Sequence, residues 1–284
     1  MHFHVHHVTR YRYNRPVWCE PLTVRLRPRS DYRQRLLSFA LDIEPAPNGL
    51  GESIDLEGNE VTTAWFEAAT DFLTVTTSFE AETKDMNPFQ FVLRPAATRL
   101  PLMPSAEEQR HYDLYAKPRA GSAEVDELAH RMAREADFGT LEFLYGLNEW
   151  VHAQHEKILR PDGAAWEPQQ TLREGRGACR DLALLFSEVC RVFNIPSRFV
   201  SGYGASLDEA TDRELHAWAE VYLPGAGWRG FDPSLGLAIT EQHLAVAVGA
   251  TPELAAPTSG TFRGDAESRL EAEIVIETTA AGSI

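Results

Sequence analysis

The sequence predicts an α+β protein in which an antiparallel β domain, shaped as a sandwich or barrel, precedes a mixed domain. The front third of the chain holds only short runs rich in β-branched and aromatic residues, such as "LTVRLRP" and "FLTVTTSFEAE". From Ser122 onward apolar residues recur at helical spacing, as in "TLEFLYGLNEWVHAQHEKI". A chain of 284 residues can bury a full core in each of two such domains.

The domain boundaries follow from changes in this pattern. We expect the β domain to span residues 1–115, ending near the proline-rich linker "RPAATRLPLMPSAEEQ". The mixed domain then spans residues 116–250. Residues 251–284 form a C-terminal extension in which "AESRLEAEIVIETT" is one further strand, expected to close back onto a sheet.

Charge and composition restrict the partners and the compartment. A formal net charge of −15 disfavours nucleic acid and anionic membranes as partners, because the field of the whole molecule repels them. No apolar stretch reaches the roughly 20 residues of a membrane-spanning helix. The start "MHFHVHHVTR" lacks a signal-peptide core, and three cysteines do not make a disulfide framework. We therefore expect a cytoplasmic protein and leave its oligomeric state open.

Histidines cluster at two places without indicating a metal centre. His2, His4 and His6 would share one face of a strand, about 7 Å apart, which is too far for them to hold one ion together. We interpret them as part of a solvated strand face. His152 and His155 are expected on an exposed helix end, because no further ligand lies nearby in the sequence. No metal and no cofactor is expected.

The stretch "GRGACRDLALLFSEVC" raises four possible roles for Cys179: nucleophile, metal ligand, disulfide partner or packing residue. A helix that begins near Ala178 would bury one apolar stripe, made of Leu182, Phe186, Val189 and Phe193. Cys190 then lies about 16 Å further along the helix, at 1.5 Å rise per residue. That separation is too large for a disulfide or for a shared zinc ion.

The two remaining roles of Cys179 are both compatible with this segment. The unpaired N–H groups and the helix dipole at a first turn favour a thiolate over a thiol. The same N–H groups could bind an oxyanion that forms when the sulfur attacks a carbonyl. A free cysteine also packs well as a small apolar residue, which is the only role we expect for Cys190.

A base for a thiol nucleophile is expected in "ELHAWAEVYLPGAGWRGFDP". His216 begins one strand, "PGAG" turns the chain, and a second strand ends at Asp232. If Tyr222 pairs with Trp228, His216 and Asp232 are diagonal neighbours about 7 Å apart. The carboxylate could then hold the imidazole and support its protonated form.

This hairpin argument depends on the strand register. A slip of one residue would move Asp232 to the other face of the hairpin. Glu220 shares a face with His216 and is the alternative carboxylate. Taken singly, His216 could be an ordinary half-buried histidine and Asp232 an ordinary turn residue.

Four motifs in this half of the chain carry a family resemblance: "CRD", "IPSRFVSGY", "HAWAEVY" and "GWRGFDP". Together they resemble the transglutaminase-like superfamily of cysteine enzymes, most closely the bacterial proteins with an N-terminal β domain. "RYRYNRPV" and "VRLRPRS" are similar to that N-terminal domain. The resemblance implies a papain-like, transglutaminase-like α+β catalytic domain. It also implies that Cys179 is the nucleophile, His216 the base and Asp232 the residue that orients the base.

The resemblance further implies attack on an acyl carbon through a thioester intermediate. Trp166, Ala178 and Trp218 are the residues we expect to contact the substrate or line an oxyanion hole. We predict acyl transfer or hydrolysis on peptide or protein amides, with hydrolysis or transfer to a small amine ahead of protein crosslinking. Protein transamidation and a catalytically silent binding module are the alternatives. No acidic loop of the kind that binds calcium is present.

Overall fold

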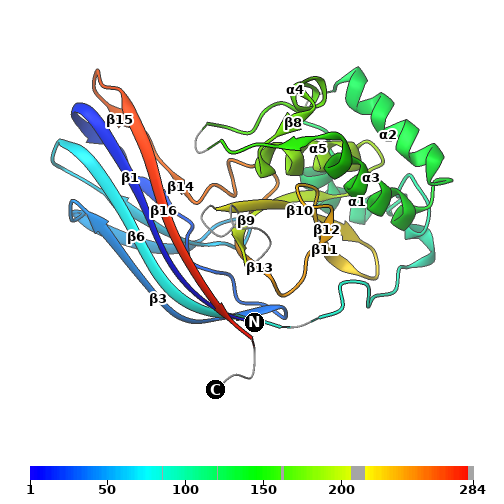
Figure 1. Ribbon diagram of the computed structural model, residues 1–284, viewed down its shortest axis with the longest axis horizontal. Coiled ribbons are helices and arrows are strands. Elements are labelled where there is room, and N and C mark those ends of the chain that lie inside the picture. Colours follow the sequence, from blue (N-terminus) through cyan, green and yellow to red (C-terminus); the bar gives the residue numbers. More distant parts are fainter. Residues whose placement is uncertain (85, 120, 161–162, 206–214, 281–284) are drawn as a thin grey trace.

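The structure is a computed structural model that describes residues 1–284 except 85, 120, 161–162, 206–214 and 281–284. Long antiparallel strands stand beside a smaller sheet covered by helices (Figure 1). The predicted α+β class is confirmed. None of the described helices combines the length and the apolar character that crossing a membrane would require.

The largest sheet contains both the first and the last strand of the chain. Its order is β15–β1–β6–β3, and β16 pairs with β1, where the register places His2 opposite Thr279. The bounds are β1 His2–Cys19, β3 Gln34–Glu44, β6 Thr70–Thr83, β15 Phe262–Arg263 and β16 Ser268–Thr279. All the pairings in it are antiparallel. The C-terminal segment is therefore an integral part of the sheet that the N-terminal strand begins.

A second antiparallel sheet packs against the first and completes the β domain. Its order is β14–β2–β5–β4, with bounds Thr258–Ser259, Leu22–Val24, Glu60–Trp65 and Gly49–Ile54. The alternating burial along β6 directs every second side chain into the space between the sheets. This core contains Val17, Leu22, Val24, Ile43, Ala64, Leu73 and Val75.

The third sheet belongs to the mixed domain and carries its helices. Its order is β12–β11–β10–β9–β13, all antiparallel, with bounds Leu237–Ala238, Gly227–Asp232, His216–Leu223, Ser197–Gly204 and His243–Gly249. Helix α5, Cys179–Arg191, packs against β10 and begins where the sequence predicts. Its predicted stripe is buried in the same core as Ala219, Val221 and Phe231.

The other helices surround α5 and end at clear sequence signals. α1 (Ala106–Ala116) is capped by Ser105, and α2 (Ala123–Glu135) by Ser122. α4 (Pro168–Glu174) starts with a proline and ends at Gly175, whose φ of 59° suits glycine. The remaining elements are η1 (Pro95–Ala97), α3 (Thr140–Gln154) and the short parallel pair β7 (Glu156–Lys157) and β8 (Arg176–Gly177).

The predictions for the two histidine clusters have different outcomes. His4 and His6 are exposed, as expected for a solvated strand face, and His4 lies 3.7 Å from Glu277. The expectation that His155 is exposed is wrong. It is 8% exposed, because the ring folds back at the end of α3 and donates a hydrogen bond to the Val151 carbonyl at 2.9 Å.

The β domain and the mixed domain share an apolar core. Phe3 and Phe79 of the large sheet pack in one buried cluster with Tyr203 of β9 and Leu244 of β13. The Tyr203 hydroxyl also contacts His7 Nδ1 at 2.8 Å. Burial lowers the pKa of His7 to about 4, so its ring is neutral at physiological pH. The mixed sheet therefore rests directly on the β domain.

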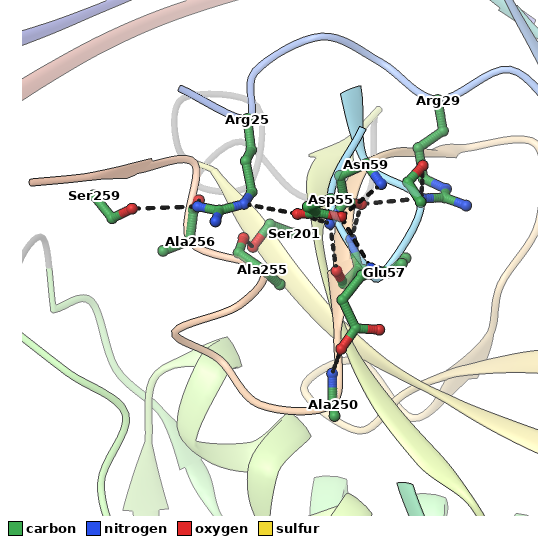
Figure 2. A network of polar contacts seen from close by, with 12 residues as sticks. Arg25, Arg29, Asp55, Glu57, Asn59, Ser201, Ala250, Ala255, Ala256 and Ser259 are labelled. Atoms are coloured by element: carbon green, nitrogen blue, oxygen red, sulfur yellow. Dashed lines mark hydrogen bonds and ion pairs between the residues drawn. The ribbon is translucent and has the colours of Figure 1, made fainter. Parts of the chain in front are cut away.

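A polar network around Arg25, Asp55 and Asn59, which we call the clamp, joins the same two domains (Figure 2). At its centre is the turn between β4 and β5, where Asp55 accepts hydrogen bonds from Arg25 Nε and Asn59 Nδ2, both at 3.1 Å. Asn59 reaches β13, donating to the Val248 carbonyl at 2.7 Å and accepting its N–H at 2.9 Å. The turn of one domain thus extends the edge of a sheet in the other.

The clamp also holds the segment of residues 250–259. Arg25 Nη1 donates to Ser259 Oγ at 3.2 Å and to the Ala256 carbonyl at 3.4 Å (Figure 2). Ser201 Oγ, on β9, donates to the Ala255 carbonyl at 2.7 Å. Cys179 packs against the small cluster to which Ala255 belongs. The β domain therefore fixes a segment that lies near the start of α5.

Candidate active site

The start of α5 presents Cys179 at the end of a tight turn. Gly175 ends α4 in a left-handed conformation, and two residues later the chain passes close to the new helix. A methyl group at Gly177 would lie 2.9 Å from Cβ of Asp181, so the close approach requires glycine. Ala178 caps the helix with extended backbone. Cys179 is half-buried and its thiol is free.

The hairpin of β10 and β11 brings His216 to Asp232. Its predicted register is confirmed, because Tyr222 pairs with Trp228. The His216 ring donates through Nε2 to Asp232 Oδ2 at 2.5 Å. Both side chains are buried, 3% and 0% exposed. Cys179 lies close enough to His216 to raise the pKa of the imidazole, and Nδ1 is the ring nitrogen that Asp232 does not occupy.

The surroundings of His216 favour its protonated form. Burial lowers its pKa, but the charge and hydrogen bond of Asp232, together with the contact to Cys179, outweigh that effect and raise the pKa to about 10. Burial raises the pKa of Asp232, yet His216 and His243 hold it well below its usual range. An imidazolium that lies beside a sulfur atom can stabilise a thiolate, and the buried carboxylate favours the imidazolium.

The second oxygen of Asp232 is held separately. Oδ1 accepts the N–H of Ser234 at 3.0 Å and its hydroxyl at 2.7 Å. These bonds fix the plane of the carboxylate, so that Oδ2 faces the imidazole.

Glu220, the alternative carboxylate, has other partners. It is fully buried and binds Arg198 Nε at 2.8 Å as well as Arg33. Burial raises its pKa, but the two arginines lower it to about 2. Glu220 therefore serves an ion-pair cluster, and Asp232 is the carboxylate on His216.

Asp181 organises the backbone around Cys179 in a way that sequence reasoning missed. Its carboxylate is 0% exposed and accepts the N–H groups of Ala178 and Trp166, each at 2.8 Å. It also accepts Arg160 Nη1 at 3.0 Å. The "CRD" motif contained the signal, since an acidic residue at the third helix position commonly reaches back to the start of its helix.

Removing the Asp181 carboxylate should destabilise the protein strongly. Asp181→Ala leaves Arg160 without this ion pair and two N–H groups without an acceptor. We expect the free energy of unfolding to fall by about 3–5 kcal/mol, as for other broken buried pairs. Urea unfolding measures the change. The exposed Glu127→Gln on α2 is the control and should unfold as the wild type does; equal midpoints for both variants would contradict this role.

The three residues expected to contact the substrate lie in different surroundings. The N–H of Ala178 is bound to Asp181, so the N–H of Cys179 is the nearest first-turn donor for an oxyanion. The Trp166 ring lies 4.4 Å below the Arg160 guanidinium. Trp218 is 1% exposed and packs with Val200, Ala245 and Val248. Substrate contact by any of the three stays a prediction.

Two histidines and a carboxylate converge here, which raises the question of a metal. Ligand atoms of His216, Asp232 and His243 lie within 4.8 Å of one another. Two ligands of one zinc ion are about 3.3 Å apart when each bond is near 2.0 Å. His216 Nε2 and Asp232 Oδ2 are separated by only 2.5 Å. That separation fits a direct hydrogen bond and leaves no place for an ion between them.

Two family models match the chain. Residues 3–82 match the bacterial transglutaminase-like N-terminal region, and residues 126–233 match the transglutaminase-like superfamily. Residues 126–233 belong to the transglutaminase-like superfamily. This superfamily comprises cysteine-dependent enzymes, and its matched region contains Cys179, His216 and Asp232.

Individual relatives of this transglutaminase-like protein cover different amounts of it. An uncharacterized protein of Mycobacterium leprae is 29% identical over 281 residues, with 96% of each chain covered. YebA of Bacillus subtilis, also uncharacterized, is 24% identical over 46% of this chain and 20% of its own length. The crystal structure of a candidate cysteine protease from Cytophaga hutchinsonii superposes with a TM-score of 0.72 at 20% identity, covering 99% of this chain and 92% of that one. This structural match shows a shared fold.

Proposed function

We propose that this transglutaminase-like protein uses Cys179 to attack the carbonyl carbon of a peptide or protein amide. The observation that carries the proposal is the buried His216–Asp232 pair, 2.5 Å apart, beside a half-buried Cys179 that raises the pKa of His216. This arrangement supports assigning Cys179 as nucleophile, His216 as base and Asp232 as orienting carboxylate, the order that acyl transfer requires. No cofactor is needed for this chemistry.

In the first half of the reaction the Cys179 thiolate bonds to the carbonyl carbon and the carbonyl oxygen becomes an oxyanion. The N–H groups of the first turn of α5 stabilise that charge. The intermediate collapses by breaking the C–N bond, and the leaving amine takes the proton from Nδ1 of His216. A thioester on Cys179 remains.

In the second half of the reaction an acceptor resolves the thioester. His216, now neutral, takes a proton from water or from a primary amine as that group bonds to the acyl carbon. The C–S bond breaks, which restores the thiolate and the imidazolium. Water gives hydrolysis, and an amine gives transamidation. We place hydrolysis first, in agreement with the description of the Cytophaga hutchinsonii protein as a candidate cysteine protease.

Mass spectrometry of the intact protein tests the shared step. The enzyme is incubated with dimethylated casein, with and without a fluorescent primary amine, and quenched in acid. We expect an acyl adduct on Cys179, and released ammonia or new peptide termini without incorporation of the amine would mark hydrolysis. Incorporation of the amine into casein would instead identify a transamidase. The Cys179→Ala protein is the control and should form no adduct.

A silent binding module would give a different result. It would capture a protein partner but form no adduct with casein, with a mixed peptide library or with p-nitrophenyl acetate. Such inertness in a folded protein would contradict the enzymatic proposal.

A further inference from the structure

A second histidine lies on the carboxylate that holds His216. His243 begins β13 and is 4% exposed. Its Nε2 is 3.4 Å from Asp232 Oδ2, the oxygen that His216 also contacts. His243 lies beyond residues 126–233, the part of the chain that matches the superfamily model, and none of the sequence motifs includes it.

One hydrogen bond to the His243 ring indicates which nitrogen carries its proton. Nδ1 accepts the backbone N–H of Thr240 at 3.3 Å, so the ring proton of the neutral form is on Nε2 and faces Asp232. The ring packs edge-on against Trp218, with 5.5 Å between centroids. A methyl group at Gly202 would lie 2.5 Å from the Trp218 indole, so the glycine leaves space for the indole that contacts His243. The imidazole is thus held in place on both sides.

We propose that His243 is a positioning residue for the catalytic pair: its Nε2–H shares the Asp232 carboxylate with His216 and keeps that carboxylate ionised and aligned. This inference rests on the proposed function. At 3.4 Å the contact is longer than an ordinary hydrogen bond, and such contacts often shorten when the substrate binds.

The need for a second donor arises during the reaction. While His216 is an imidazolium, its positive charge compensates Asp232. Once Nδ1 has given its proton to the leaving amine, a buried carboxylate faces a neutral ring, and an uncompensated buried charge is unfavourable. The Ser234 donors bind Oδ1, whereas the His243 N–H offers a further dipole at Oδ2, the oxygen that faces His216. The same N–H also weakens the negative electrostatic potential of Asp232 at His216, which makes the imidazolium a better acid.

Charged groups on all sides of His243 contribute to the charge balance around the Asp232 carboxylate. Asp232 and His216 face it from β11 and β10. A cavity of about 50 Å³ lies next to it, and the charged residues in the cavity wall are Arg33, Lys84, Arg229 and Glu241. Among these groups Asp232 is the carboxylate in contact with the His243 ring.

Two variants separate positioning from packing. His243→Phe keeps an aromatic ring but has no donor, whereas His243→Gln places an N–H₂ group near the position of Nε2. With p-nitroacetanilide, whose leaving group is an amine, as the acyl donor and EDTA present, we expect His243→Phe to lower kcat about 10-fold with KM little changed. NMR titration of the His216 ring should show a higher midpoint in this variant. His243→Gln should stay close to the wild type in both measurements.

A buried histidine elsewhere provides the control. His7→Gln alters a ring that is 3% exposed and whose hydrogen-bond partners are Tyr203 and Thr9, so it should leave the titration of His216 unchanged. Equal titration midpoints and kcat values for His243→Phe and the wild type would overturn the inference, as would equal losses in the Phe and Gln variants. Slow iodoacetamide labelling of Cys179 in the wild type would instead overturn the proposed function itself.

Discussion

Cys179→Ala should abolish turnover and leave the fold intact. Loss of the nucleophile removes the covalent route, and related triads lose about 10⁴-fold or more in rate. In the wild type, iodoacetamide at pH 7 should label Cys179 at least about 100-fold faster than the other thiols, because a thiolate is the reactive species. Cys190 is fully buried, and burial raises its pKa; burial likewise raises the pKa of Cys19. Peptide mapping after partial labelling measures the order.

The matched control for this experiment is Cys190→Ala. It should retain both turnover and the rapid labelling phase, because the Cys190 side chain only packs in the core of the mixed domain. Equal, slow labelling of all three cysteines in a folded wild type would contradict an activated Cys179.

Asp232→Asn should reduce turnover by a similar amount while preserving the size of the side chain. An asparagine cannot compensate the imidazolium, so burial is then opposed only by the contact to Cys179, and the pKa of His216 should fall well below about 10. The rate loss of about 10⁴-fold expected for such a change reflects an imidazole in the wrong state for catalysis. NMR titration of the His216 ring measures the first effect, and p-nitrophenyl acetate turnover the second.

The same substitution should change how stability depends on pH. The pKa of His216 is raised in the folded protein, so its contribution to stability is complete below about pH 6.5 and is lost as the pH rises towards 10. The wild type should therefore lose thermal stability between pH 7 and pH 10, and Asp232→Asn should lose much less. Glu127→Gln should follow the wild type. Identical pH profiles for all three proteins would contradict the assigned ion pair.

The sequence alone predicted those features that short-range patterns determine. Helical spacing placed the start of α5 at Cys179, and the turn "PGAG" with its flanking strands set the register of Tyr222 and Trp228. Because the side-chain period of a strand is two, that register also decided which face Asp232 occupies. The α+β class followed from the same periodicities.

Contacts between distant segments were beyond such reasoning. His243 reaches Asp232 only because β13 pairs with β9 on the far side of β10. Within the clamp, Arg25 binds Ser259, a residue that lies far away in the sequence. His155 was misplaced because its polar sequence context suggested solvent, whereas its ring satisfies a carbonyl at the end of its own helix. Neither the His243–Asp232 contact nor the Arg25–Ser259 bond leaves a local signature.

The pairing of β1 with β16 has a consequence for how the chain is synthesised. During synthesis β1 emerges before the mixed domain and β16 emerges after it, so one edge of β1 stays unpaired while the whole mixed domain emerges. The domain that comes second in the sequence can therefore complete its sheet before the first one does. Until then the nascent protein carries an open strand edge, which is a site for mispairing between neighbouring chains.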